Sequence, residues 1–430
     1  MTTATWATEE LRTLDLGDRR RTKRYIQLLD TAVKDSSASI AKLGKDYHQS
    51  KAYYRLLSNP AVDSQTVLSA HEDQLHTRIS KQPIVLCIQD TTEIQTDRLS
   101  ATGMGRLNYD ARKGYYTHTT LITDTNGIPL GIYDNWHWAR KPKGHITIKE
   151  SRRWIEGYQR ICELSDQHPT TTHLYVADRE SDMMDIIQYG HQQQHPADYL
   201  LRARHNRVLQ DGSKLFDVTD EDIMGEVQFH IPTRQGQSGR AITQSVFVKR
   251  VKLTDGIPIT LIVSRELNPP KGKKAIEWKL ITNQTITSFE QAVTMIDYYR
   301  KRWQIEVLFH VLKTGCRIES RPFGSFDTHE RALMLYLLVS YRILLMTMLA
   351  RQTPNVNCEV LFGTHEWQVA YKVRYRKPPP KKPISLRDMV RLIAGFGGFL
   401  GRKSDKEPGV KTLWLGLAAL NGYCIGASCG

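Results

Sequence analysis

Residues 299–313 read YRKRWQIEVLFHVLK. In a helix, at about 100° per residue, Tyr299, Arg302, Glu306 and Lys313 share one arc of about 60°. The arc is bordered by the apolar side chains of Ile305, Leu308, Phe309, Val311 and Leu312. A solvated charged face would be broad, whereas this polar stripe is narrow. Half-buried charges are costly unless they are paired or bind something. Glu306 is therefore a candidate metal ligand, with neighbouring Tyr, Arg and Lys side chains suited to an anion.

Upstream of the stripe, the sequence alternates between helical and strand patterns. Residues 1–75 read as short helices, one of them capped by Asp18. Residues 84–88 (IVLCI) and 174–177 (LYVA) are compact apolar runs, typical of buried strands. Asn126-Gly127 is a strong hairpin turn between two further strand patterns. This mixture predicts an α/β fold.

Residues 206–285 have a different texture, because alternating apolar residues and an Asp-Gly turn indicate a β-rich insertion. Residues 288–291 (SFEQ) then form a capping box that begins the helix bearing the stripe. A stiff basic linker, KPPPKKP, spans 377–383. The chain continues in a helical region, but the last ten residues, after Leu420, have little helical character.

Two aspartates accompany the predicted strands. Asp90 follows the first apolar run and Asp178 ends the second. A carboxylate at a strand end is often only a turn-former, and that interpretation stays open for each Asp taken alone. Together with Glu306, however, they supply three carboxylates from two strands and a helix, a set that suits hard cations such as Mg²⁺. Two such ions would clamp the attacking and leaving oxygens of phosphoryl transfer.

The composition favours a polyanionic partner. The 430 residues include 60 Lys and Arg against 45 Asp and Glu, a net charge of +15, which most often means nucleic acid. A merely soluble basic protein would show the same balance. The six cysteines are scattered without a C-x-x-C pair, which argues against a zinc ribbon or a disulfide framework and suits a reducing cytosol.

The sequence also predicts a location. The N-terminal residues lack the apolar core of a signal peptide. Residues 332–350 are apolar and of spanning length, but Ser340 and Arg342 lie within them, so we interpret them as a core helix and expect no membrane partner. A cytoplasmic protein is therefore expected.

Several of these motifs together resemble one family. Asp90-Thr91-Thr92, Asp178-Arg179-Glu180 and the spacing of the polar stripe are similar to the DDE transposases of the IS-four insertion-sequence family, bacterial cut-and-paste enzymes with a Y-R-E-K signature. The resemblance runs through the chain and also includes LGD at 16–18, NPPKG at 268–272 and GGFLGRK at 397–403. The Y-R-E-K spacing is specific, whereas a lone D-R-E or D-T-T would be weak.

The resemblance implies an RNase H-like catalytic core, a mixed sheet flanked by helices, with a β-rich insertion between Asp178 and Glu306. It adds an α-helical N-terminal domain and a small α-helical C-terminal domain. The predicted regions are an end-binding domain at 1–75, the catalytic domain at 76–205 and 286–355, the insertion at 206–285, and a dimerisation and synapsis region at 356–430.

The resemblance also implies roles for the motif residues. Asp90, Asp178 and Glu306 would be the catalytic residues and would bind two Mg²⁺ or Mn²⁺ ions. Tyr299, Arg302 and Lys313 would hold phosphates of the transposon end.

Further DNA contacts are expected outside the stripe. Trp278 would receive a base flipped out during hairpin formation, with Trp303 stacking near it, although core packing is the alternative for either ring. Arg21 and Arg24 match helix positions that touch end DNA, yet a solvated basic face would look the same. Arg202 and Arg204 follow an apolar pair and are also candidate phosphate contacts.

The sequence therefore predicts a DNA transposase that acts on transposon ends and target DNA as a homodimer. Two alternatives remain open at this point. One is another RNase H-like nuclease, and the other is a catalytically silent DNA-binding protein derived from a transposase.

Overall fold

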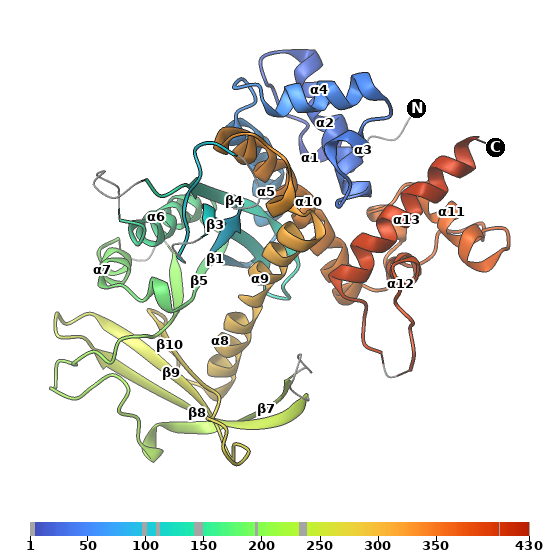
Figure 1. The fold of residues 1–430 in the computed structure, drawn as a ribbon. Coiled ribbons are helices and arrows are strands. Elements are labelled where there is room, and N and C mark those ends of the chain that lie inside the picture. Colours follow the sequence, from blue (N-terminus) through green and yellow to red (C-terminus); the bar gives the residue numbers. More distant parts are fainter. Residues whose placement is uncertain are drawn as a thin grey trace. The chain divides into compact units, whose positions relative to one another are not determined.

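The computed structural model describes residues 5–96, 101–108, 112–141, 149–193, 197–231, 239–403 and 405–429. Two units can be distinguished among the elements in Figure 1. The first unit comprises Met1–Ile79, Thr91–Thr147 and Gln304–Gly430, and the second comprises Ser80–Asp90 and Ile148–Trp303. Strand β1 (Ile84–Gln95) passes from the second unit into the first, because its residues after Asp90 belong to the first.

The second unit is built on one mixed sheet with the strand order β1-β5-β6-β10-β9-β8-β7. Strands β1, β5 and β6 are parallel, and the other pairs are antiparallel. The strands are β5 (Thr172–Ala177), β6 (Asp198–Arg202), β7 (Ile223–Ile231), β8 (Arg240–Lys252), β9 (Pro258–Glu266) and β10 (Glu277–Thr282). The helices are α6 (Arg152–Gln167), α7 (Met184–Gln192) and α8 (Phe289–Lys301).

The predicted β-rich insertion is present as β7 to β10, and it continues the core sheet instead of forming a separate layer. Antiparallel pairing of β10 with β6 joins the two parts, with Leu280 opposite Arg202. Helix α8 begins at the predicted capping box, in which Ser288 Oγ accepts a hydrogen bond from the backbone N–H of Gln291 and the Gln291 side chain bonds back. Helix α8 therefore leads directly from the insertion to the polar stripe.

The first unit combines a small antiparallel sheet with most of the helices. Its strands are β2 (Gly105–Arg106), β3 (Lys113–Asp124) and β4 (Pro129–Trp138), and β3 also lies beside the second half of β1. Its helices are α1 (Trp6–Glu10), α2 (Arg19–Lys34), α3 (Ile40–Leu43), α4 (Tyr47–Leu57), α5 (Ser64–Ile79), α9 (Trp303–His310), α10 (Phe326–Gln352), α11 (Thr364–Tyr375), α12 (Leu386–Phe396) and α13 (Val410–Cys429). The fold class expected from the sequence is thus confirmed: a mixed sheet flanked by helices, with helical N- and C-terminal regions.

Helix α10 is the core helix of the first unit. It is long and apolar enough to cross a membrane by length and composition, but 89% of its most apolar window is buried inside the protein. Its two polar outliers are used internally, since Ser340 Oγ donates to the Tyr336 carbonyl at 2.7 Å and the Arg342 guanidinium donates to the Leu361 carbonyl. The sequence predicted a core helix over residues 332–350, and the burial of α10 agrees with that prediction.

Two sequence-based expectations were wrong at the level of elements. The polar stripe does not lie on one uninterrupted α-helix, because α8 ends at Lys301, Arg302 forms a tight turn, and α9 passes into a π-helix at Val311–Gly315. The C-terminal residues after Leu420 are helical, because α13 extends to Cys429. Gly and Ser lower helix propensity there and most of these residues are exposed, although the Tyr423 ring packs against Phe396 at 5.2 Å between centroids.

Candidate active site

Asp90 on β1 and Asp178, directly after the parallel neighbour β5, occupy corresponding positions in the chain. The register of β1 and β5 runs from Ile84 opposite Thr172 to Ile88 opposite Val176, and each aspartate lies two residues further on. Parallel neighbours are about 4.8 Å apart, and residues in register project to the same face. Asp90 lies in the middle of β1, which continues to Gln95, whereas Asp178 follows directly after β5. Burial raises the pKa of the Tyr175 hydroxyl and both carboxylates add to that rise, so they lie near each other. The sequence had predicted that the first strand ends before Asp90, and that expectation was wrong.

Asp178 has the turn-forming role considered above. It caps a short 3₁₀-helix at Arg179–Ser181, where its Oδ1 accepts a hydrogen bond from the Glu180 N–H at 2.8 Å. This turn engages one carboxylate oxygen, and an ionised carboxylate has several further acceptor positions. The turn role and a ligand role are therefore compatible in the same side chain.

Asp90 is paired with Arg302. The Arg302 Nη1 lies 2.8 Å from Asp90 Oδ2, and both side chains are largely buried, at 14% and 17% exposed. Arg302 is held by the tight turn after α8, in which its N–H donates to the Tyr299 carbonyl at 3.0 Å. A guanidinium thus compensates a predicted metal ligand, a contact that spacing alone did not predict.

Tyr299 is buried beside the same charges. Burial raises the pKa of its hydroxyl, and the positive charges of Arg302 and Arg202 oppose that rise. Arg202 ends β6, so three elements of the second unit (β6, α8 and the turn after α8) bring Arg202, Tyr299 and Arg302 together. Two cations beside a buried phenol are suited to an anion such as a phosphate.

The two aspartates fit a divalent cation. Carboxylate oxygens are the ligands that Mg²⁺ prefers, and two like charges side by side are stabilised by a cation between them. Among the described residues, no group of three or more His, Cys, Asp or Glu side chains is arranged to hold a metal ion. The third predicted ligand, Glu306, belongs to the first unit.

Glu306 lies half-buried on α9, and the apolar residues bordering the stripe are buried as predicted. Lys313 lies in the π-helix that follows. Burial lowers the pKa of the Lys313 ammonium, while the charges of Glu319 and Glu93 act to raise it. Glu93 is on the part of β1 that belongs to the first unit, so Lys313 lies close to that part of the strand.

Trp278 is part of an aromatic cluster in the second unit. Its ring centroid lies 6.0 Å from that of Phe229 at an interplanar angle of 20°, and 6.0 Å from that of Tyr299 at 62°. The Arg300 guanidinium lies 4.9 Å from the Phe229 ring centroid. Phe229 was missed because an aromatic residue in an alternating strand normally indicates packing. Trp303, by contrast, is 48% exposed, so core packing does not explain it.

Arg204 projects from a loop that Asp182 holds in place. Asp182 is buried, and its Oδ2 accepts hydrogen bonds from the N–H groups of Arg204 and His205 at 2.6 and 2.9 Å. Its Oδ1 pairs with Arg207 Nη2 at 2.6 Å. Asp182 could not be singled out from the sequence, because its partners are about 22 residues away.

The two arginines of α2 that were predicted to contact DNA, Arg21 and Arg24, differ. Arg21 Nη1 donates to the Leu16 carbonyl at 2.6 Å and holds the turn at Gly17, whose φ is +75°. Its guanidinium thus has a structural role in the LGD motif. Arg24 is exposed and lines a cavity of about 400 Å³ with Lys45 and His48.

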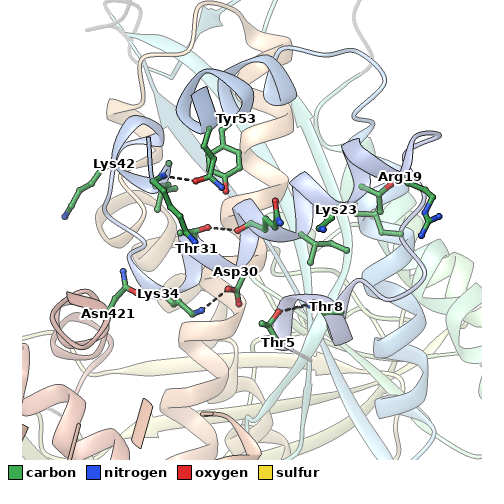
Figure 2. Close-up of a pocket in the computed structure, with 18 of the residues that line it drawn as sticks. Thr5, Thr8, Arg19, Lys23, Asp30, Thr31, Lys34, Lys42, Tyr53 and Asn421 are labelled. Atoms are coloured by element: carbon green, nitrogen blue, oxygen red, sulfur yellow. Dashed lines mark hydrogen bonds and ion pairs between the residues drawn. The ribbon is translucent and has the colours of Figure 1, made fainter. Parts of the chain in front are cut away.

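A larger cavity of about 1120 Å³ lies in the first unit. Residues of the N-terminal helices form most of its wall, and Asn421 and Ile425 of α13 complete it. Figure 2 shows the basic side chains Arg19, Lys23, Lys34 and Lys42 around it, with Lys34 Nζ paired to Asp30 at 2.8 Å. None of the three predicted acidic ligands lines this cavity.

Comparison with known families covers nearly the whole chain. Residues 3–62 match a transposase DNA-binding family, residues 62–341 match the transposase DDE domain, and residues 338–429 match the Tn5 transposase dimerisation domain. The chain is also similar to a cryo-EM structure of a piggyBac transposase synaptic complex with hairpin DNA. That similarity has a TM-score of 0.40 at 11% sequence identity, over 81% of this chain and 72% of the other.

Because the DDE domain alone matches more than half of the chain, this protein belongs to the DDE transposases. The order of DNA-binding, DDE and Tn5 dimerisation domains is that of the IS-four type expected from the sequence. The protein is thus a DNA transposase, an enzyme that acts on DNA.

Proposed function

We propose that this transposase moves its element by cut-and-paste. One strand is nicked at the transposon end, and the freed 3′-OH attacks the opposite strand, which closes a hairpin. Water reopens the hairpin, and the 3′-OH then joins target DNA. Each step exchanges one phosphodiester bond for another or hydrolyses it, so one centre suffices for all of them.

The observation that supports this chemistry most directly is the register of β1 and β5. Continued by two residues, this register would bring Asp90 and Asp178 side by side. Two neighbouring carboxylates suit a divalent ion. We propose Glu306 as the third ligand, on the family's Y-R-E-K motif. Two Mg²⁺ or Mn²⁺ ions held by these carboxylates would activate the attacking group and stabilise charge on the leaving oxygen.

The surrounding side chains would position the DNA. Arg302, Tyr299, Arg202 and Lys313 are proposed to hold phosphates near the scissile bond, and Arg204 and Arg24 to contact the backbone further away. Trp278 would take up an extruded base, with Trp303 as its exposed neighbour in the motif. Arg21 would act mainly through the turn that it holds.

The partners follow from the matched domains, which are DNA-binding and dimerising. We propose that two copies pair two transposon ends in a synaptic complex and then capture target DNA. This would take place in the bacterial cytoplasm, at the nucleoid.

Strand cleavage with a single substitution tests the proposal. Asp178→Asn keeps an amide oxygen that can accept the Glu180 N–H, so the turn should persist while the charge of the ligand is lost. With Mg²⁺ and DNA that flanks the gene, we expect wild-type protein to nick the end and Asp178→Asn to lose nicking by at least about a hundredfold. DNA binding should be nearly unchanged, because phosphate contacts elsewhere carry affinity.

A matched control is Asp255→Asn. Asp255 is also a turn aspartate after a strand, with its Oδ1 accepting from the Ile257 N–H at 3.4 Å. The Asp255→Asn variant should cleave DNA like the wild type. Near wild-type nicking by Asp178→Asn would show that the carboxylate is only a turn-former, and absence of nicking by the wild type would identify a silent DNA-binding protein.

A further inference from the structure

A second basic cavity lies in the second unit, next to β10. We call it the β10 cavity, and its volume is about 190 Å³, enough for several water molecules. It is lined by Arg179, Ala203, Arg204, Phe216, Glu277 and Lys279. Its floor is fixed by the sheet, because the Ala203 N–H donates to the Lys279 carbonyl at 2.8 Å.

Three of the lining side chains are cations, and the single carboxylate is already engaged. Glu277 Oε2 pairs with Arg265 Nε at 2.6 Å, and its Oε1 pairs with Lys279. Burial acts to raise the pKa of Glu277, but the hydrogen bonds from Lys279 and Arg265 bring it below its ordinary value. The carboxylate therefore stays ionised and serves to hold two cations, and the charge that surrounds the cavity is net positive.

The Lys279 ammonium and the backbone at Arg204 and Arg179 are held before any ligand arrives. Lys279 Nζ lies 4.7 Å from the Phe216 ring centroid, and the Phe216 N–H donates to Asn206 Oδ1 at 2.8 Å. The backbone of Arg204 is held by Asp182. Arg179 follows Asp178 in the 3₁₀ turn that the Asp178 carboxylate caps. A preorganised set of cations loses less conformational entropy when it binds an anion.

The β10 cavity faces away from the aromatic cluster. Successive side chains of a strand point to opposite faces, so Glu277 and Lys279 lie on one face of β10 and Trp278 on the other. Trp278 contacts Phe229 and Tyr299, whereas Lys279 contacts Phe216. The cavity is thus distinct from the place proposed above for an extruded base.

We propose that the β10 cavity binds one phosphodiester group of a DNA backbone. DNA then contacts both faces of β10, with its backbone on the Lys279 face. Arg179, Arg204 and Lys279 are the ligands of the phosphate, and Glu277 positions Lys279. The inference rests on the proposed function only in that DNA is the substrate, and its test needs no divalent ion.

The test measures the binding of a duplex of arbitrary sequence in EDTA, by fluorescence anisotropy over a series of salt concentrations. Each phosphate contact contributes about 0.9 to the slope of log K against log salt. The slope should become shallower by about 0.9 in Lys279→Gln. In the double variant with Arg179→Gln and Lys279→Gln, the slope should become shallower by at least the same amount. Lys279→Arg keeps the charge and should retain the wild-type slope. Lys252→Gln, an exposed lysine on β8, is the matched control and should also retain it.

Two further arms separate the other outcomes. Melting temperatures of all variants report folding, and the Lys279→Arg variant keeps the comparison valid if Lys279→Gln is unstable. Melting with millimolar inorganic phosphate reports a free anion. An unchanged salt slope in the double variant overturns the proposal. The proposal is also overturned if inorganic phosphate stabilises the protein through Lys279 while the salt slope of DNA binding is independent of Lys279. Because no divalent ion is present, failure of the cleavage assay leaves this result unaffected.

Discussion

At the scale of single residues, the pair between Arg302 and Asp90 links two functions that the sequence suggested separately. Arg302 was expected to hold DNA, and Asp90 to hold a metal ion. In the structure the guanidinium lies 2.8 Å from the carboxylate, where it competes with a cation for the same oxygen. Metal binding and DNA binding should therefore favour each other, because a phosphate that draws Arg302 away leaves Asp90 available.

Arg302→Ala should consequently tighten Mn²⁺ binding in the absence of DNA. A partly buried ion pair of this kind contributes about 1 kcal/mol, which corresponds to roughly fivefold in affinity. The same variant should bind DNA more weakly. Isothermal titration with Mn²⁺ measures the first effect and anisotropy the second. Arg152→Ala is the control, since the exposed Arg152 pairs with Glu156 along α6. Weaker Mn²⁺ binding by Arg302→Ala would contradict the competition.

Glu10 determines a pH dependence of stability. It is buried, with its Oε1 2.6 Å from His71 Nδ1 and its Oε2 2.5 Å from Arg78 Nη2. The Ile132 N–H donates to His71 Nε2, so the hydrogen of this imidazole is on Nδ1 and points at Glu10. Burial acts to raise the pKa of Glu10, but these partners lower it from 4.5 to about 2.

Because the folded-state pKa is lowered, the stability that ionised Glu10 contributes is complete above about pH 4.5 and is lost as the pH falls towards about 2. A shift of this size corresponds to on the order of 3 kcal/mol. Urea unfolding of wild type and Glu10→Gln should give a stability difference that is constant above pH 5 and shrinks below it. A difference that stays constant down to pH 3 would show that Glu10 is not the titrating group.

At the scale of elements, strand β10 and helix α8 together hold the aromatic cluster around Trp278. Trp278→Ala should impair hairpin closure more than nicking, because only the hairpin requires a sharply bent strand with an extruded base. Stacking contributes about 1–3 kcal/mol per base, enough for a tenfold to hundredfold effect on that step. Time courses of nicked and hairpin products on gels distinguish the two steps. Equal losses in both, with a lower melting temperature, would mean that Trp278 only packs.

The strand before Asp178 was predictable from the sequence, because a buried strand in an α/β protein is a short apolar run and the polar residue after it is conspicuous. The first strand was predicted only in part, because β1 continues through Asp90 to Gln95 along half-buried polar residues that an apolar run does not reveal. The interruption of the stripe at Arg302 was not predictable. Spacing assumes a uniform helix, whereas the chain tightens at Arg302 and widens into a π-helix at 311–315. The contacts of Asp182 and Lys279 were equally inaccessible, because they join residues from distant parts of the chain.

At the scale of the whole chain, the N-terminal helices are part of the first unit's core. Arg78 joins Glu10 to the Leu130 carbonyl on β4. The buried guanidinium of Arg321 donates to the carbonyls of Ser36 and Ala38, between α2 and α3, and to that of Cys316. A family match that ends at residue 62 therefore does not mark a detachable module.

Deletion of residues 1–75 should accordingly destabilise the rest of the protein as well as remove end recognition. It removes His71 and Glu10 from Arg78, and it leaves Arg321 buried without two of its acceptors, a loss of several kcal/mol. Thermal unfolding of the truncated protein should begin well below that of wild type. Arg24→Gln is the milder comparison, because it removes one exposed cation and should weaken DNA binding at an unchanged melting temperature.

The sequence indicated which regions exist, but not how they connect. Alternation in 206–285 identifies strands, yet edge pairing between β10 and β6 depends on backbone groups that every residue has. Only side-chain patterns are visible in a sequence, so the continuation of the core sheet through the insertion was not predictable.

The matching positions of Asp90 and Asp178 make this centre sensitive to changes in length. Side chains alternate along a strand, so one residue inserted or deleted between Ile84 and Asp90 would turn the carboxylate to the opposite face, although every residue type would be kept. Substitutions within β1 alter packing by degrees, whereas a single-codon insertion there would separate the two acids at once. Length changes in this gene should therefore be tolerated in its surface turns and be lethal to transposition in the parts of these two strands that precede the aspartates.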